Sequence, residues 1–242
     1  MDKCAQKFAL YCGLAFPIVF FAGMLIGGLL PLPSPSDDLD EVRAFWADDP
    51  TRIRIGLFIM VASAPLQAPL FGLIGIHMRR IEGKHSILAY TQMMLGGVAV
   101  LAVLIPVMQM VNVAFRPEDR DPATLQFFSD GAWLIFVGMW SAASMQSICI
   151  ALCVLRDRRP TPVIPRYYGY FNLWVATVFV PGGLIYFFKS GAFAWNGAVA
   201  FWLPATVFGT WFVVSFVVFR RVIDQQPDDD DEPAAVARAV AA

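Results

Sequence analysis

The feature that most constrains this chain is a series of six long apolar segments, none of which contains Asp, Glu, Lys or Arg. A helix that crosses the hydrocarbon core of a bilayer needs about 20 apolar residues, because the core is roughly 30 Å thick and each residue rises about 1.5 Å. All six segments reach that length. Their bounds are Phe8–Leu30, Ile55–Met78, Ile87–Phe115, Ala132–Leu155, Tyr168–Phe188 and Asn196–Phe219.

The segments are continuous runs, whereas the strands of a membrane β-barrel are short and alternate between apolar and polar residues. Hydrophobic residues make up 58% of the chain and charged residues only 15%, where a soluble domain has roughly a quarter of its residues charged. We therefore expect an all-α membrane protein with six transmembrane helices, arranged as three helical hairpins and surrounded by membrane lipids.

The basic residues predict the orientation of the chain. Lys and Arg near the ends of transmembrane helices are retained in the cytoplasm. Most of them lie near the two chain ends and in the loops that follow the second and fourth segments. This pattern places both termini in the cytoplasm. We expect a transmembrane domain over residues 1–223, followed by an acidic, solvated and mobile cytoplasmic tail over residues 224–242.

The first two extracytoplasmic loops each contain the pattern of a short helix. Asp38 and Glu41 form a capping pair at the start of an apolar face that includes Trp46. Asp121 followed by Pro122 is a typical helix start. We expect both helices to lie in the membrane interface.

The charges also exclude several functions. A net charge of −1 argues against binding of nucleic acid, which requires a basic surface. Catalysis, ion conduction and proton transfer inside a membrane usually need an ionisable residue there, and the six segments lack Asp, Glu, Lys and Arg. His77 and His85 flank a loop and are expected to be solvated. Cys149 and Cys153 lack a second pair that would complete a metal site. The sequence thus predicts no metal site, cofactor or catalytic residue, and an enzyme is the least favoured function.

Neutral polar residues and helix breakers remain inside the segments. Gln67 lies between Pro65 and Pro69, which must kink the second segment, and Pro181-Gly182-Gly183 and Pro204 interrupt the last two. Broken transmembrane helices often line a binding site. If the chain holds a cavity, the expected polar contacts are Gln67, Gln109, Asn112 and Gln146, with Trp140 and Trp174 as walls. Hydrogen bonding between helices is the alternative role of these amides.

Two hypotheses for function follow. Amides among aromatic rings suit a small hydrophobic molecule with one or two hydroxyl or carbonyl groups, such as a lipid or a sterol, which the protein would bind or pass. Small residues instead favour helix association, and they occur as Gly23 and Gly27 in the first segment and as Ala143, Ser147 and Ala151 in the fourth. The second hypothesis is therefore an accessory or scaffold subunit with a protein partner, or a homo-oligomer.

Four local strings resemble an uncharacterised family of bacterial six-helix integral membrane proteins. They are Arg52-Ile53-Arg54-Ile55-Gly56, Met78-Arg79-Arg80-Ile81-Glu82-Gly83, Phe171-Asn172-Leu173-Trp174 and Phe193-Ala194-Trp195-Asn196-Gly197. The resemblance covers nearly the whole chain outside the acidic tail. It implies a location in the bacterial inner membrane, and it brings no substrate, cofactor or catalytic residue with it.

Overall fold

The computed structural model describes residues 2–226, and this part of the chain consists of helices and connecting loops, with no strand. Six helical segments are long and apolar enough to cross a membrane, which confirms the prediction of an all-α chain with six candidate spans. They are Lys3–Ile26, Pro50–Glu82, Ile87–Phe115, Pro122–Arg156, Arg166–Tyr186 and Gly191–Asp224. Most of the predicted acidic tail, residues 227–242, lies outside the described residues.

The first and third spans are single helices, α1 (Lys3–Ile26) and α5 (Ile87–Phe115). The second span is broken, as its two prolines predicted. Helix α3 (Pro50–Ser63) is followed by a 3₁₀ turn, η1 (Ala64–Gln67), and then by α4 (Ala68–Glu82).

The last three spans are also interrupted. The fourth consists of α6 (Pro122–Gly138) and α7 (Trp140–Arg156), and the fifth of α8 (Arg166–Val178) and the 3₁₀ segment η2 (Val180–Tyr186). The sixth begins with the 3₁₀ turn η3 (Gly191–Phe193), passes through the π-helical segment η4 (Ala198–Trp202) and continues as α9 (Leu203–Asp224).

Caps explain why several helices extend beyond their apolar runs. The carboxylates of Asp2, Asp49 and Asp121 each accept a hydrogen bond from a backbone N–H in the first turn of α1, α3 and α6. Hydrogen bonds from Thr124 hold the pKa of the exposed Asp121 carboxyl below its usual range. At the other end of α1, the helix stops at Ile26 because Gly28 adopts a φ of 68°, which favours glycine.

One of the two short loop helices is present. Helix α2 (Leu39–Ala47) has the predicted capping box between Asp38 and Glu41. The prediction of a second, separate helix was wrong. The cap at Asp121 and Pro122 starts α6, which runs without interruption to Gly138, because residues 123–137 contain no proline that would end it.

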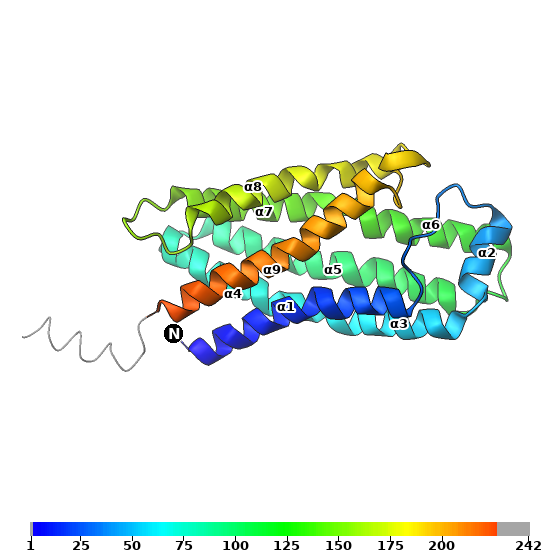
Figure 1. Cartoon of the computed structure of the whole chain (residues 1–242), viewed down its shortest axis with the longest axis horizontal. Coiled ribbons are helices and arrows are strands. Elements are labelled where there is room, and N and C mark those ends of the chain that lie inside the picture. Colours follow the sequence, from blue (N-terminus) through cyan, green and yellow to red (C-terminus); the bar gives the residue numbers. More distant parts are fainter. Residues whose placement is uncertain (1, 227–242) are drawn as a thin grey trace, which may run out of the picture.

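The spans form a ring in which each packs against the next one along the chain, and α9 packs against α1 to close it. Figure 1 shows that α1 begins beside the last turns of α9, and we call this the terminal end of the bundle. The side chains of Gln6 and Gln226 join the two helices there by a pair of 3.0 Å hydrogen bonds. Helix α2 lies across the opposite end, which we call the α2 end, and its Trp46 donates a buried hydrogen bond to Ser129 of α6.

Glycines set the distance between the first two spans. A Cβ atom added to Gly56 of α3 would lie 2.5 Å from the Gly23 carbonyl oxygen and 2.5 Å from the Cα of Gly27. The backbones of α1 and α3 are therefore in direct contact. Close approach of this kind supplies the packing that holds helices together in lipid, where no hydrophobic force acts between them.

We predict that Gly56→Ala lowers the stability of the protein by about 1–3 kcal/mol, because the added methyl group meets backbone that cannot move aside. The measurement is the midpoint of thermal unfolding in a mild detergent. Gly72→Ala is the matched control, since a Cβ at Gly72 of α4 would have no heavy atom within 4 Å. A Gly56→Ala protein that unfolds at the same temperature as the wild type and the control would contradict this account of α1–α3 packing.

Candidate functional site

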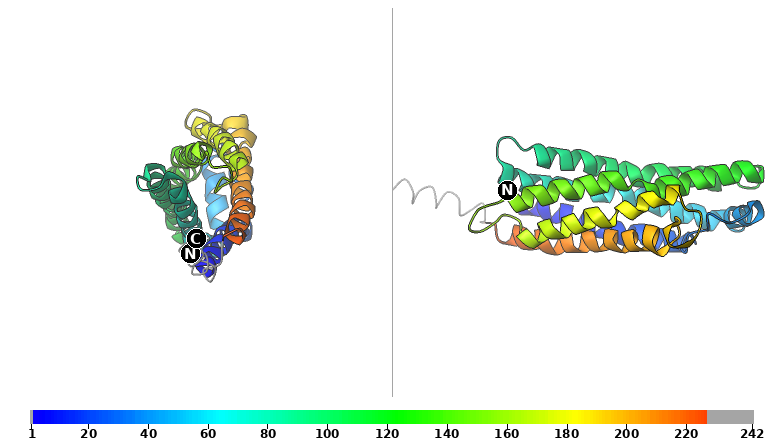
Figure 2. Two further views of the ribbon diagram at one scale, coloured as in Figure 1. Left: turned by 90° about the vertical axis from the view of Figure 1, so that its left-hand side faces the viewer. Right: turned by 90° about the horizontal axis from the view of Figure 1, so that it is seen from above.

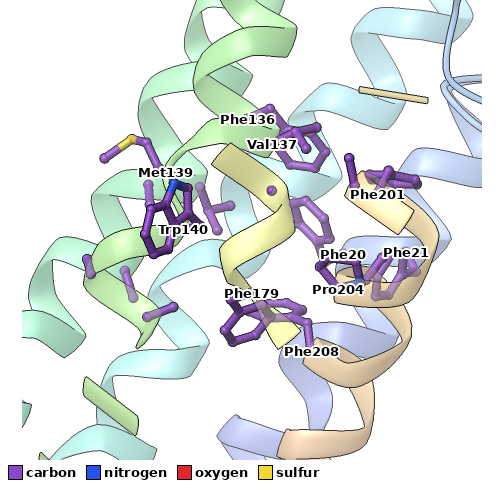
Figure 3. Close-up of a pocket in the computed structure, with 18 residues that line it drawn as sticks. Phe20, Phe21, Phe136, Val137, Met139, Trp140, Phe179, Phe201, Pro204 and Phe208 are labelled. Carbon is purple, nitrogen blue, oxygen red and sulfur yellow. The ribbon is translucent and has the colours of Figure 1, made fainter. Parts of the chain in front are cut away.

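A cavity of about 150 Å³ lies between the spans, beside Phe20 and Phe21 in the half of α1 that leads to the α2 end. Its walls come from five of the six spans: α1, α5, the α6–α7 junction, η2, and η4 with the start of α9. Figure 3 shows the aromatic side chains that surround it. No lining residue is charged, and the indole N–H of Trp140 is the one polar side-chain group in the lining.

Aromatic rings join the walls across three spans. The ring of Phe136 in α6 lies 6.0 Å from that of Phe20 in α1 and 6.5 Å from that of Phe201 in η4, measured between centroids. Phe179 and Phe208 complete the opposite side (Figure 3). Ring pairs at these separations attract one another beyond their simple packing. The cavity therefore has an aromatic wall with a defined shape.

The helix breaks of the last three spans meet at this cavity. The fourth span breaks at Met139, where ψ is 49°, and the cavity is also lined by the 3₁₀ segment η2 and the π-helical segment η4. A break leaves backbone groups without their usual helical partners. One of them, the carbonyl of Gly138, accepts a 2.6 Å hydrogen bond from the hydroxyl of Tyr186 at the end of η2. The fifth span thus supports the break in the fourth.

Glycines bring η2 against that break. A Cβ on Gly182 would lie 3.2 Å from the carbonyl oxygen of Val137, and one on Gly183 would overlap the indole ring of Trp140. The Pro181-Gly182-Gly183 sequence accordingly does more than bend the fifth span. It lets the backbone of η2 lie directly on Trp140 and holds that ring as a wall of the cavity.

The cavity is partly open, and it lies where α1 and α9 separate. Towards the terminal end these two helices are in contact through the ring pairs Tyr11–Phe216 and Phe16–Phe212. Towards the α2 end they diverge, as Figure 1 shows, and Phe21 of α1 and Pro204 of α9 line the cavity from either side of the gap. We call the line of contact between the two helices the α1–α9 seam.

Of the six residues predicted to form a site, Trp140 lines this cavity. Gln67 is fully buried in η1, and neither of its amide atoms has a hydrogen-bond partner. Gln146 of α7 is also buried, and its amide donates a long, 3.5 Å hydrogen bond to the backbone carbonyl of Gln92. Gln92, which lies on α5, has an unpartnered amide as well.

The other three predicted residues lie away from the cavity lining. Asn112 is exposed and accepts a 3.0 Å hydrogen bond from Arg120. Trp174 is half exposed on the outside of α8, and Gln109 is partly buried in α5. Gln109 and Asn112 lie about two and three turns beyond Ala102, which lines the cavity from α5. Trp174 lies more than one turn before Phe179, the next lining residue along the chain.

The small residues that suggested association with a partner are used inside the chain. Gly23 and Gly27 contact Gly56, and Ser147 and Ala151 are buried in α7, while Ala143 lines the cavity. Neither pattern forms an exposed stripe. The observations that motivated a scaffold subunit therefore have an explanation within the fold.

The prediction that His77 is solvated was wrong. Helix α4 continues to Glu82, so that His77 is fully buried beside α1 and α9. Its Nε2 lies 3.1 Å from the Gln6 side-chain oxygen and its Nδ1 lies 3.2 Å from Arg80. Within residues 2–226, no three His, Cys, Asp or Glu side chains are grouped so that they would hold a metal ion.

The residues that sequence reasoning missed are the aromatic ones, chiefly Phe20, Phe136, Phe201 and Phe208. A chain with 21 phenylalanines offers no local signal that separates these from lipid-facing ones. The Pro-Gly-Gly motif and Pro204 marked two of the breaks, but the break at Met139 follows only a single glycine.

No protein-family model matches this chain, and neither a curated protein nor a solved structure matches it. The resemblance to bacterial six-helix membrane proteins therefore stays a prediction.

Proposed function

We propose that this protein binds the hydrocarbon part of a small hydrophobic molecule, lipid-like or sterol-like, which enters the cavity from the bilayer through the gap between α1 and α9. The observation that carries the proposal is an uncharged, aromatic-walled cavity built at the breaks of three spans. Helix breaks at membrane depth are costly and are tolerated where they line a site.

The size of the cavity limits the guest. An apolar cavity of this volume accepts a molecule about as large as benzene. The bound part is therefore a single ring or a short length of chain, and the rest of a larger molecule extends through the partly open side. Dispersion contacts supply the attraction, because the atoms that line an empty void lack neighbours on one side.

Gln67 is the proposed polar contact for such a guest. Gly13 of α1 and Gly96 of α5 abut Leu70 and Phe71 of α4, respectively. Gln67 lies about one turn from these contacts, at the level of Ala99, which lines the cavity, but Gln67 itself is not part of the lining. A buried amide with neither atom hydrogen-bonded costs on the order of 1–3 kcal/mol, so a hydroxyl or carbonyl group would find a partner there.

We also propose that the spans pair as three hairpins, that α2 lies in the outer interface and that the terminal end faces the cytoplasm of a bacterial inner membrane. The support is the distribution of basic residues, which gather at the terminal end in and next to the α4–α5 and α7–α8 loops. No feature of the described residues favours catalysis. The small residues that suggested a scaffold role make contacts inside the chain.

The first prediction from this function concerns filling of the cavity. The double substitution Ala99→Leu and Ala143→Leu places branched side chains in the space and should abolish most of the binding. The probe is a fatty acid with a photoreactive diazirine group on its chain. In the wild-type protein, mass spectrometry should locate the crosslinks on residues of the cavity wall, such as Phe20, Phe136 and Phe208.

Ala62→Leu is the matched control, because Ala62 is exposed on α3 and does not line the cavity. It should leave labelling of the wall unchanged. Equal labelling of the wall in the folded cavity-filled protein, or labelling spread evenly over the outer helix faces of the wild type, would overturn the proposed function.

The second prediction concerns Gln67. Replacing it by Leu removes the polar contact while keeping the volume similar, so we expect weaker retention of a photoreactive sterol that carries a hydroxyl group. Each lost hydrogen bond corresponds to about 0.5–1.5 kcal/mol, or about a two- to tenfold change in affinity. Labelling by a diazirine hydrocarbon without polar groups should not change. Gln109→Leu is the control, and unchanged sterol retention in a folded Gln67→Leu protein would exclude this role for Gln67.

The third prediction tests the orientation. In a variant whose exposed Cys4 is replaced by Ser, a cysteine placed at the exposed Lys84, in the loop after α4, should react with a membrane-impermeant maleimide only after the inner membrane of whole cells is permeabilised. A cysteine at Ser36, in the loop before α2, should react in spheroplasts that are intact. The opposite pattern would mean that the terminal end faces the periplasm.

A further inference from the structure

A second, much smaller pocket lies on the α1–α9 seam at the terminal end, and its chemistry differs from that of the cavity. It has a volume of about 70 Å³ and is lined by Lys7, Leu10 and Tyr11 of α1 and by Arg220, Ile223 and Asp224 of α9. Two cationic side chains and a phenol therefore face one hollow between the first and last spans.

The pocket lies at the boundary between charged and apolar residues. On α1, Lys7 directly precedes the apolar run that begins at Phe8, and on α9, Arg220 directly follows the run that ends at Phe219. In a membrane-spanning bundle this level is that of the lipid headgroups. A group bound here would be reached along the membrane surface.

The side chain of Arg220 lines this pocket. It is exposed and has no hydrogen-bond or ion-pair partner among residues 2–226. Three other arginines at this end have partners among the described residues, whereas Arg221, like Arg220, has none there. Arg79 lies 5.4 Å from the ring centre of Tyr90, Arg80 contacts His77, and Arg166 donates to the backbone carbonyl of Asp157.

Lys7 is only weakly paired. Its Nζ lies 4.0 Å from a carboxylate oxygen of Asp224, and both side chains are more than half exposed. Such an exposed pair contributes little, so an anion with more than one oxygen competes for Lys7 easily. Tyr11 packs against Phe216 with ring centroids 5.5 Å apart, which places its phenol beside the same hollow.

From this arrangement we propose that Lys7, Arg220 and Tyr11 bind a phosphate group, carried by the headgroup of an anionic membrane lipid. Arginine and lysine are the usual partners of phosphate oxygens, and the phenol adds a hydrogen-bond donor. Free phosphate has the same chemistry, but the position at headgroup level on a lipid-facing seam favours the lipid. The site does not depend on the apolar cavity, which lies further along the seam.

The test is a titration of the detergent-purified protein with phosphatidylglycerol or phosphatidylcholine, followed by native mass spectrometry. The wild type should prefer phosphatidylglycerol. Lys7→Gln and Arg220→Gln should each weaken its binding about fivefold, because one cation near a lipid surface contributes about 1 kcal/mol. Asp224→Asn should strengthen it, since the substitution removes a negative charge from the pocket.

Arg221→Gln is the matched control. Arg221 neighbours Arg220 and carries the same charge, but it does not line the pocket. It should bind phosphatidylglycerol as the wild type does. Equal weakening by Arg221→Gln would show that diffuse surface charge attracts the lipid, and absence of a preference over phosphatidylcholine would show that the seam recognises no anion; either result overturns the proposal.

Two further measurements distinguish a lipid headgroup from free phosphate, and the headgroup site from the apolar cavity. A large excess of inorganic phosphate should not displace phosphatidylglycerol, and displacement would overturn the assignment to a lipid. The Ala99→Leu and Ala143→Leu protein should keep the preference for phosphatidylglycerol even though it loses labelling in the cavity. Unfolding midpoints like that of the wild type show that each variant is folded.

Discussion

The constraint on which this structure depends is that lipid offers no hydrogen bonds to a peptide backbone. Every N–H and C=O group inside the bilayer must find its partner within the chain, and continuous helices achieve this at the lowest cost. Three spans nevertheless break around the same cavity, at Met139, at η2 and at η4. The bond from Tyr186 to Gly138 shows how one span satisfies a group that another has left free. A cavity built in this way uses the least regular backbone of the bundle, which is why we place the function there.

Packing divides the bundle into two kinds of contact. Between α1 and α3, glycines bring backbone against backbone and leave no room for a methyl group. Around the cavity, phenylalanine rings hold the spans apart, and Phe136 bridges α1 and η4. In lipid, van der Waals contact is the main attraction between helices. Where aromatic rings surround an empty space, the spans lose part of that contact. The guest that we propose would restore those contacts by filling the space.

The α1–α9 seam connects the two proposed sites. Near the terminal end its helices touch and present Lys7 and Arg220 at the level of the headgroups, and towards the α2 end they separate at the cavity. The first and last spans of the chain thus close the ring, and the entrance that we propose lies between them. The closure is a tertiary feature, because residues far apart in the sequence meet there, such as Tyr11 and Phe216.

The sequence by itself determined the number of candidate spans, the break at Pro65 and Pro69, and the irregular backbone at Pro181-Gly182-Gly183. These features are local, because apolar length selects a spanning helix and proline removes a backbone donor wherever it stands. Only the tertiary structure decided which residues face one another. It placed Trp140 on the cavity and Asn112 and Trp174 outside it, buried His77 between helices, and joined α6 to what sequence had predicted as a separate helix. In a chain that is apolar on every side, hydrophobicity cannot distinguish the face that meets lipid from the face that meets protein, and that choice depends on the fit between distant side chains.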